Sequence, residues 1–445
     1  MGCFSFKKYH PHTRYKSLFS GRIRDAHYAY YHKVLDLDQR RVIRVQTAEK
    51  RDEDFIFEAL ERRLDVIGED LVSIIVSEDD LELLSWSRNE KDDIALIPFY
   101  PSPSDFPAGL PKVRRSQLTE IDRLAAQTDH TTYEPSPGHG PKHVVFKYYI
   151  TEGNIVSFWH ELNCTLRIPN HLNIVPLDCL VIDSATPGGP DKVVGFTTPF
   201  IAGGTVWDNV SRTFTLAHLN QLTKTIDYLN LQLGIVHGTI NSANLLIDPE
   251  TDQLKIFNFS WGAKLGWEGD KDHEGAVYRY DEHRNDIKMA VFAVYEIITR
   301  DLSFGPGNDA SMVLEKETWE KAAEVRLEEG VDVAEYRRVL DEWVALRKPL
   351  DAVYTHYTQT PQHIDWPSVP EFPLTESRGT IARHRALWRS ELTKRGEPFI
   401  KWQRPPTAEL PLSRGKRLLA TGEIVDEDPQ FQSMISPVPY EYRWK

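Results

Sequence analysis

Residues 233–247 read LGIVHGTINSANLLI. A short apolar run leads into His237, an asparagine follows seven positions later at 244, and the apolar residues 245–247 come directly after it. A second apolar run, in LKIFNFSWGAKLG at residues 254–266, also ends in a polar turn. Polar loops carried between short β-like runs are typical places for the residues with which an enzyme does chemistry.

Composition limits the classes of protein to which the chain can belong. It has 445 residues, of which 40% are hydrophobic and 11% aromatic, which is enough for two or three domains with a sizeable core. The net charge of −13 argues against a general nucleic-acid binder. Residues 1–50 are an exception, with 11 Lys and Arg against 4 Asp and Glu. This basic segment fits an anionic partner, although a solvated basic face is the simpler interpretation.

Three further observations predict an intracellular protein, cytoplasmic or nuclear. The three cysteines (Cys3, Cys164 and Cys179) form no Cys-x-x-Cys motif and fit a reducing compartment. The first residues contain no apolar stretch of the kind found in a signal peptide. The longest apolar stretch, at residues 289–298, is too short for a transmembrane segment.

Periodicity predicts both helices and strands. Apolar residues at helical spacing predict helices over residues 54–70, 154–168, 218–234, 284–301 and 381–396. Short apolar runs predict strands within residues 71–77, 94–100, 142–150, 171–183 and 192–204. Residues 116–141 show little periodicity. A proline-rich link at residues 99–115 suggests a boundary.

This order of elements predicts an α+β protein with a two-lobed domain, in which a small β-rich lobe precedes a large helical one. We expect an N-terminal α/β extension over residues 1–112, the two-lobed domain over 113–350, and a C-terminal tail with one helix over 351–445, packed on the helical lobe. The sequence does not indicate what the extension does.

The two polar loops resemble the catalytic loop (His-Arg-Asp-x-x-x-x-Asn) and the Asp-Phe-Gly turn of protein kinases. Their order and spacing match those of the kinase motifs. The amino-acid sequence of residues 113–350 resembles a divergent group of kinase-like proteins from filamentous fungi. Matched position by position, the corresponding residues are His237, Gly238, Thr239 and Asn244 in the loop, and Asn258, Phe259 and Ser260 in the turn.

Upstream residues extend the resemblance. Residues 144–147 (VVFK) resemble the kinase strand whose lysine holds the phosphates of ATP, and the resemblance makes Lys147 that lysine and Glu161 its partner. Residues 197–205 (TTPFIAGGT) resemble the hinge that binds adenine. The resemblance implies that Thr198 is the gatekeeper, that Pro199 and Ile201 offer a carbonyl and an N–H, that Leu246 lies under the ring, and that Asp286 braces the catalytic loop.

The chain departs from the kinase pattern where the chemistry is done. Thr239 stands at the position of the catalytic Asp, and Asn258 at that of the Asp that holds Mg²⁺. Threonine is a far poorer base than a carboxylate, and Mg²⁺ prefers charged oxygen ligands. Gly238 replaces the Arg, and no Gly-x-Gly-x-x-Gly precedes Lys147. ATP is therefore an expected ligand, and Mg²⁺ a weakly held one, at Asn244 and Asn258.

Several of these residues also have simpler structural explanations. Lys147 and Glu161 fit an ordinary solvated pair, and His237 a core histidine. Asn244 fits a brace for its loop as well as it fits a weak Mg²⁺ ligand. Asn258 fits a turn residue that bonds to its own backbone. Gly138 and Gly140 fit the tip of a hairpin better than a clamp for phosphate.

Three hypotheses follow. The first is a pseudokinase, which binds ATP without transferring phosphate and acts through protein partners. The second is an active, atypical Ser/Thr kinase that takes its base from elsewhere. The third is an interaction module that keeps the fold but binds no nucleotide. Substrate, partner and oligomeric state are not indicated by the sequence.

Overall fold

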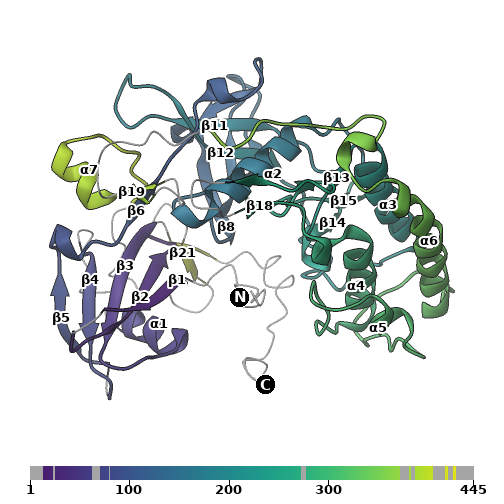
Figure 1. Ribbon diagram of the computed structural model, residues 1–445, viewed down its shortest axis with the longest axis horizontal. Coiled ribbons are helices and arrows are strands. Elements are labelled where there is room, and N and C mark those ends of the chain that lie inside the picture. Colours follow the sequence, from purple (N-terminus) through teal and green to yellow (C-terminus); the bar gives the residue numbers. More distant parts are fainter. Residues whose placement is uncertain are drawn as a thin grey trace. The chain divides into compact units, whose positions relative to one another are not determined.

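The computed structural model describes residues 14–23, 26–62, 71–79, 81–271, 277–370, 380–381, 386–403, 416–418 and 424–426. The protein is a mixed α+β structure, as predicted (Figure 1). It divides into two compact units. Unit 1 consists of Met1–Ile155, Asp178–Thr197 and Glu371–Glu427, and unit 2 of Val156–Leu177, Thr198–Pro370 and Asp428–Lys445.

The start of unit 1 is a five-stranded sheet with one helix packed on it. Its strands lie in the order β1 (Tyr15–Arg22), β2 (Tyr30–Asp36), β3 (Arg41–Thr47), β4 (Ser73–Val76) and β5 (Leu83–Ser87). Strands β3 and β4 are parallel, and helix α1 (Glu53–Glu61) lies in the connection between them. Asp52 caps this helix by accepting a hydrogen bond from the Phe55 N–H. The core is apolar and includes Val34, Ile43, Ile56, Leu60 and Ile74.

The second sheet of unit 1 has six strands, and only the last residues of β12 extend beyond the unit. The order is β7 (Lys112–Arg114), β11 (Cys179–Asp183), β12 (Lys192–Pro199), β10 (Lys142–Tyr148), β9 (Thr128–Tyr133) and β8 (Thr119–Ala125). Strands β8, β9 and β10 are consecutive and antiparallel. Gly138 and Gly140, both at positive φ, lie in the turn from β9 to β10, which confirms the predicted hairpin tip.

Arg40 joins the two sheets of unit 1. This buried residue lies in the turn between β2 and β3 at a φ of 50°. Its guanidinium pairs with Asp129 at 2.6 Å and with Glu120 at 2.8 Å, and it lies 4.6 Å from the ring centre of Tyr148. A buried cation with two carboxylates and an aromatic face is well compensated. The side chain of Arg40 is therefore one of the contacts that hold the N-terminal sheet to the second sheet.

Part of the C-terminal tail also belongs to unit 1. Strands β6 (Leu96–Pro98), β20 (Ala386–Trp388) and β19 (Thr380–Ile381) form a small sheet, and β21 (Lys416–Leu418) pairs with β22 (Ile424–Asp426). Buried Trp402 stacks on Tyr148 and donates to the Tyr100 hydroxyl at 2.8 Å. Helix α7 (Arg389–Arg395) begins later than predicted, because residues 386–388 pair with β6 as a strand.

Unit 2 is mainly helical. Its helices are α2 (Ile155–Arg167, whose first residue belongs to unit 1), α3 (Leu216–Asp227), a π-helical turn (Tyr228–Gln232), α4 (Asp286–Thr299), α5 (Ser311–Leu314) and α6 (Val333–Val353). The short strands β13 (Ile235–Val236) and β16 (Ala263–Lys264) pair with each other, as do β14 (Leu245–Ile247) with β15 (Leu254–Ile256) and β17 (Asp270–Lys271) with β18 (Val277–Tyr278).

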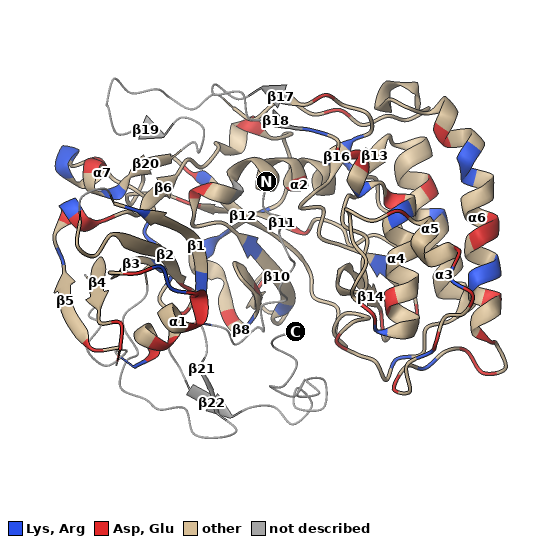
Figure 2. Ribbon diagram, turned by 60° about the horizontal axis from the view of Figure 1, so that its bottom comes forward, with Lys and Arg blue, Asp and Glu red and all other residues tan. Residues whose placement is uncertain are grey.

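The core of unit 2 surrounds α4. Ten of its fourteen residues are buried, as the apolar sequence predicted. Asn285 caps its N-terminus, and its side chain accepts from the Ile287 N–H at 3.0 Å. Charges of both signs lie along α6 (Figure 2), where Arg338 pairs with Glu335 and Glu342. The predicted boundary at residue 350 lies inside α6, and the three-part division stays a prediction.

Single turns of 3-10 helix connect these elements at Glu90–Asp92, Pro103–Asp105, Arg115–Gln117, Glu152–Asn154, Ser242–Asn244, Glu282–Arg284 and Tyr357–Gln359. The other predicted helices and strands lie where periodicity placed them, although residues 63–70 of the first helix fall outside the described residues. Within the described residues, no helix has both the length and the hydropathy needed to cross a bilayer.

Gly195 of β12 is required by close packing against β10, and this gives a first prediction. A Cβ at this position would lie 2.4 Å from the Lys147 carbonyl oxygen and 2.5 Å from the Phe146 ring. We expect Gly195→Ala to lower the free energy of unfolding by roughly 1–3 kcal/mol through overpacking. Gly153→Ala, where no atom lies within 4 Å of the added Cβ, should change it by about 0.5 kcal/mol or less. Urea denaturation measures both, and equal values for the two variants would contradict the prediction.

Candidate functional site

The loop at residues 237–244 is held by the carboxylate of Asp286, the first residue of α4. Its Oδ2 accepts hydrogen bonds from the His237 N–H at 2.8 Å and from the Asn230 side chain at 2.9 Å. Its Oδ1 accepts from the Gly238 N–H at 2.8 Å. Asp286 is buried, so these donors supply the stabilisation that water would otherwise give. The position of the loop therefore depends on this one carboxylate.

Burial raises the pKa of the Asp286 carboxyl above its ordinary value, while the donors from Asn230, Gly238 and His237 act against this shift. A second layer supports the first. Buried Arg347 of α6 donates to the Asn230 side-chain oxygen at 3.1 Å and pairs with Asp227 at 2.5 Å. Hydrogen bonds thus connect α6 to the loop through Asn230 and Asp286.

His237 is a structural residue of this loop. It is fully buried, and its Nε2 lies 2.9 Å from the Phe257 carbonyl oxygen. Its ring also packs on Phe259, with 4.6 Å between ring centres. His237 therefore ties the loop to the Asn258-Phe259-Ser260 turn. It is the only titratable residue between 237 and 244, and residues 257–262 contain none.

Thr239 offers neither a base nor an exposed hydroxyl. Its exposed fraction is 1%, and its Oγ1 lies 3.4 Å from the His237 Nδ1. Its carbonyl accepts a hydrogen bond from the Asn244 side chain at 2.7 Å. Asn244 thus braces its own loop, as one of the sequence interpretations proposed. A buried, neutral hydroxyl in this position cannot accept a proton as a carboxylate would.

Asn244 and Asn258 are bonded to each other. The Asn258 Nδ2 donates to the Asn244 Oδ1 at 2.9 Å. Asn258 has a φ of 68°, a left-handed conformation that asparagine tolerates better than most residues. Two carboxylates that face each other repel unless a cation lies between them. Two side-chain amides, as here, form a hydrogen bond with each other directly.

These two residues fit a Mg²⁺ site poorly, because neither carries charge and the Asn258 amide takes one of the two lone pairs of the Asn244 oxygen. Nor does the described part of the chain contain a group of three or more His, Cys, Asp or Glu side chains that could hold a metal ion.

Gly238 lies where a side chain has no room. Its φ is 76°, and a Cβ would lie 2.6 Å from the Trp261 carbonyl oxygen. The arginine found beside Gly238 is Arg284, which lies 46 residues later in the sequence. The guanidinium of Arg284 stacks on the Trp261 ring, 3.7 Å from its centre, and donates to the Gly238 carbonyl at 3.4 Å.

The other predicted site residues fall in both units. Lys147 is half-buried on β10 of unit 1, and Glu161 lies on α2 of unit 2 with 3% of its surface exposed. The interpretation of Lys147 and Glu161 as a solvated pair is therefore wrong for Glu161, since a carboxylate this buried needs a partner. The pairing of Lys147 with Glu161 stays a prediction.

The predicted hinge residues Thr198, Pro199 and Ile201 are half-buried, and so is Leu246 on β14. Leu246 forms a β-bridge with Thr205, which follows the hinge in sequence. No hydrogen bond to the Ile201 N–H is found among the described residues. The role in adenine binding that the resemblance gives this donor stays a prediction.

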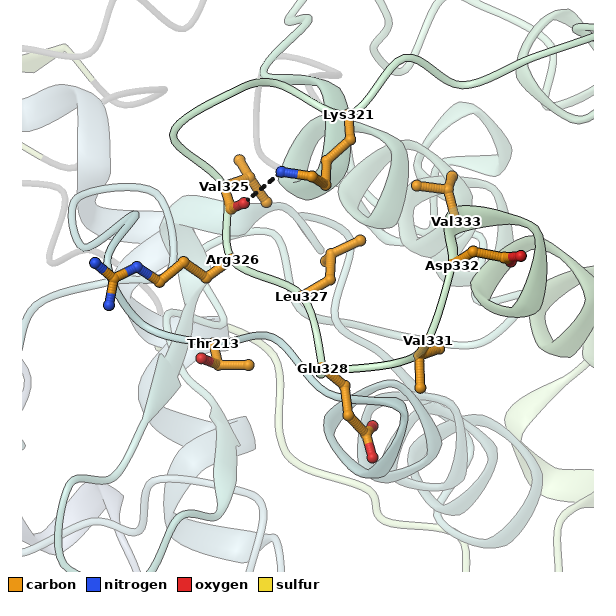
Figure 3. A pocket seen from close by; sticks show the side chains of 9 residues that line it. All are labelled: Thr213, Lys321, Val325, Arg326, Leu327, Glu328, Val331, Asp332 and Val333. Carbon is orange, nitrogen blue, oxygen red and sulfur yellow. Dashed lines mark hydrogen bonds between the residues drawn. The ribbon is translucent and has the colours of Figure 1, made fainter.

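A cavity of about 530 Å³ in unit 2 contains none of the predicted site residues (Figure 3). Lys321 points at the Val325 carbonyl and donates to it at 2.8 Å. Glu328 accepts from the Leu216 N–H and Asp332 from the Glu335 N–H, each at 3.0 Å. Three of the four charged side chains that line the cavity therefore bond to the backbone of described residues, the exception being Arg326.

Sequence reasoning missed the residues that support the site. Asn230, Arg347, Arg284 and Trp261 belong to no motif and lie up to 120 residues from their partners. One signal was present for Asn230, a polar residue between Leu229 and Leu231 in a segment with helical spacing of apolar residues. No comparable signal marks Arg347, which is one of many charged residues on α6.

Comparison with known proteins gives no assignment: no protein-family model matches the chain, and no curated protein is significantly similar to it.

Asp286 gives the second prediction. Asp286→Asn removes the charge that three donors share and turns an N–H group toward one of them. We expect a loss on the order of 3 kcal/mol in the free energy of unfolding. Asp341→Asn, the same change on the exposed side of α6, should cost about 0.5 kcal/mol or less. Denaturant unfolding measures both, and a tolerated Asp286→Asn would show that the loop does not depend on this carboxylate.

Proposed function

We propose that the chain is a protein-kinase-like protein that has lost phosphotransferase activity and acts through binding. The observation that carries this proposal is the contrast between the scaffold of the site and the residues at its centre. The scaffold around Asp286 is complete, whereas the two positions that should be carboxylates are Thr239, which is buried, and Asn258, which is bonded to Asn244.

The order of β8, β9, β10 and α2 along the chain supports the kinase resemblance. In protein kinases the phosphate-binding lysine is on the third strand, and its glutamate partner is on the helix called αC. Lys147 lies on β10, the third of the consecutive antiparallel strands β8, β9 and β10. Helix α2, which carries Glu161, is the next α-helix in the chain.

The turn between β8 and β9 departs from the kinase arrangement. A glycine-rich loop covers the phosphates in kinases. Here the turn carries buried Gln127, whose carbonyl accepts from the Tyr148 N–H at 3.1 Å. Its side chain accepts from the Ile150 N–H at 2.7 Å. A turn fixed in this way to the end of β10 cannot fold over a phosphate, which supports the loss of catalysis.

The loss of chemistry follows from electrostatics. Phosphoryl transfer depends on positioning and on charge placed where negative charge develops. Residues 237–244 and 257–262 contribute no carboxylate, and the only imidazole among them is bonded to Phe257. The active, atypical kinase would need its base and its metal ligands from outside these two segments. We therefore place it second.

The third prediction concerns activity. We expect the purified protein to transfer no phosphate from ATP to itself or to generic Ser/Thr substrates above the level of a Lys147→Ala control, because both charged groups of the site are missing. Radiolabelled ATP with Mg²⁺ or Mn²⁺ measures this. Transfer by the natural protein that Lys147→Ala abolishes would establish the active kinase instead.

The fourth prediction separates a nucleotide-binding protein from an interaction module. We expect ATP at about 100 times its Kd to stabilise the fold by about 2.7 kcal/mol and to raise Tm by several degrees. Lys147→Ala should remove the shift. Lys142→Ala, at the other end of β10, should keep it. Thermal unfolding measures all three proteins, and no shift at saturating ATP would leave the interaction module.

A further inference from the structure

Residues 355–367, which follow α6, lie across three separate parts of unit 2, and we call them the strap. The Tyr357 N–H donates to the Leu265 carbonyl at 2.8 Å, which connects the strap to the segment after β16. The Gln362 and Ile364 N–H groups donate to the Gln232 and Leu233 carbonyls at 2.9 and 3.0 Å. The strap therefore adds its own backbone to two loops that adjoin the candidate site.

Two glycines let the strap approach this closely. Gly266 has a φ of 64°, and a Cβ there would lie 2.0 Å from the Thr355 carbonyl oxygen. Gly234 has a φ of 66°, and its added Cβ would lie 2.8 Å from the Tyr357 Cα. Both positions require glycine for conformation and for space. A larger residue at Gly234 or Gly266 would therefore clash with the strap.

Lys264 of β16 is held in a cage that the strap completes. Its ammonium pairs with Asp365 at 2.7 Å. It also lies 4.5 Å from the ring centre of Trp267, 5.1 Å from that of Tyr357 and 5.3 Å from that of Trp366. Lys264 is buried, so the carboxylate and the rings replace its hydration. Three of its four partners belong to the strap.

The same end of the strap is attached to α2. The Trp366 indole N–H donates to the His160 Nδ1 at 2.9 Å, and the Trp159 indole N–H donates to the Pro367 carbonyl at 3.0 Å. The ring of Trp366 is 5% exposed and lies in an apolar cluster with Cys164 of α2 and with Phe259. Trp366 therefore contacts α2 directly and shares an apolar cluster with Phe259 of the turn that contains Asn258.

We propose that the strap holds α2 and residues 259–267 in one fixed arrangement, with Trp366 and Lys264 as its latch. In protein kinases the position of the glutamate-bearing helix and the order of the activation loop are controlled from outside, by phosphorylation among other means. In this chain a covalently continuous segment makes both contacts at once. The arrangement of α2 and residues 259–267 then needs neither phosphorylation nor a bound ligand.

Hydrogen exchange on the full chain tests this proposal. We expect Trp366→Ala to speed amide exchange by about tenfold or more in both α2 and residues 259–267. Trp319→Ala is the matched control, because Trp319 is equally buried in unit 2 and donates its indole N–H to the Val313 carbonyl, but lies outside the strap. It should leave exchange in both segments unchanged.

Lys264→Met is the milder variant, since it keeps an apolar stem against the rings and removes only the charge. It should speed exchange in the same two segments, by a smaller factor, and it decides the question if Trp366→Ala does not fold. The proposal is overturned if exchange in α2 stays at the natural rate in these latch variants, or if Trp319→Ala speeds both segments equally.

Discussion

The carboxylate of Asp286 is the interaction on which the candidate site depends. It accepts from two consecutive backbone N–H groups, of His237 and Gly238, and from the Asn230 side chain. Arg347 of α6 donates to the Asn230 side chain, so both α4 and α6 contribute to the position of the loop. The other hydrogen bonds of the site involve this loop. His237 bonds to the Phe257 carbonyl, Asn244 to the Thr239 carbonyl, and Asn258 to the Asn244 side chain.

The loop keeps contacts that fix its position but lacks the charged side chains that phosphoryl transfer needs. Asp286 and Asn230 position the loop, while Thr239, Asn244 and Asn258 are neutral and hydrogen-bond to one another. A site made for metal and phosphate would place uncompensated oxygens there, and it would store an electrostatic cost that the ligand relieves. A pair of bonded amides stores no such cost, so the loop is stable without a ligand. The strap is consistent with this interpretation, since its contacts with Leu265 and with α2 come from within the chain.

The sequence predicted the elements with strong apolar periodicity, such as α4 and β10, and it located the loop residues from their spacing. It missed β8 and β9 because their buried positions are polar: Asp129 and Thr131 are buried on β9, and Asp129 pairs with Arg40, which lies 89 residues earlier. It placed residues 386–388 in a helix because pairing with β6 is a long-range effect. Arg347 and Trp366 were beyond reach for the same reason, since each acts on a partner distant in sequence.

The central claim is that a direct bond between Asn244 and Asn258 takes the place of a bound cation. Titration of Mg²⁺ into the ATP-saturated protein, followed by thermal unfolding, tests it most directly when the natural chain is compared with Asn258→Asp. The account predicts that Mg²⁺ leaves the Tm of the natural protein unchanged and raises that of the variant, which regains a charged oxygen ligand. A saturable rise in the natural protein, lost in Asn258→Ala, would contradict it.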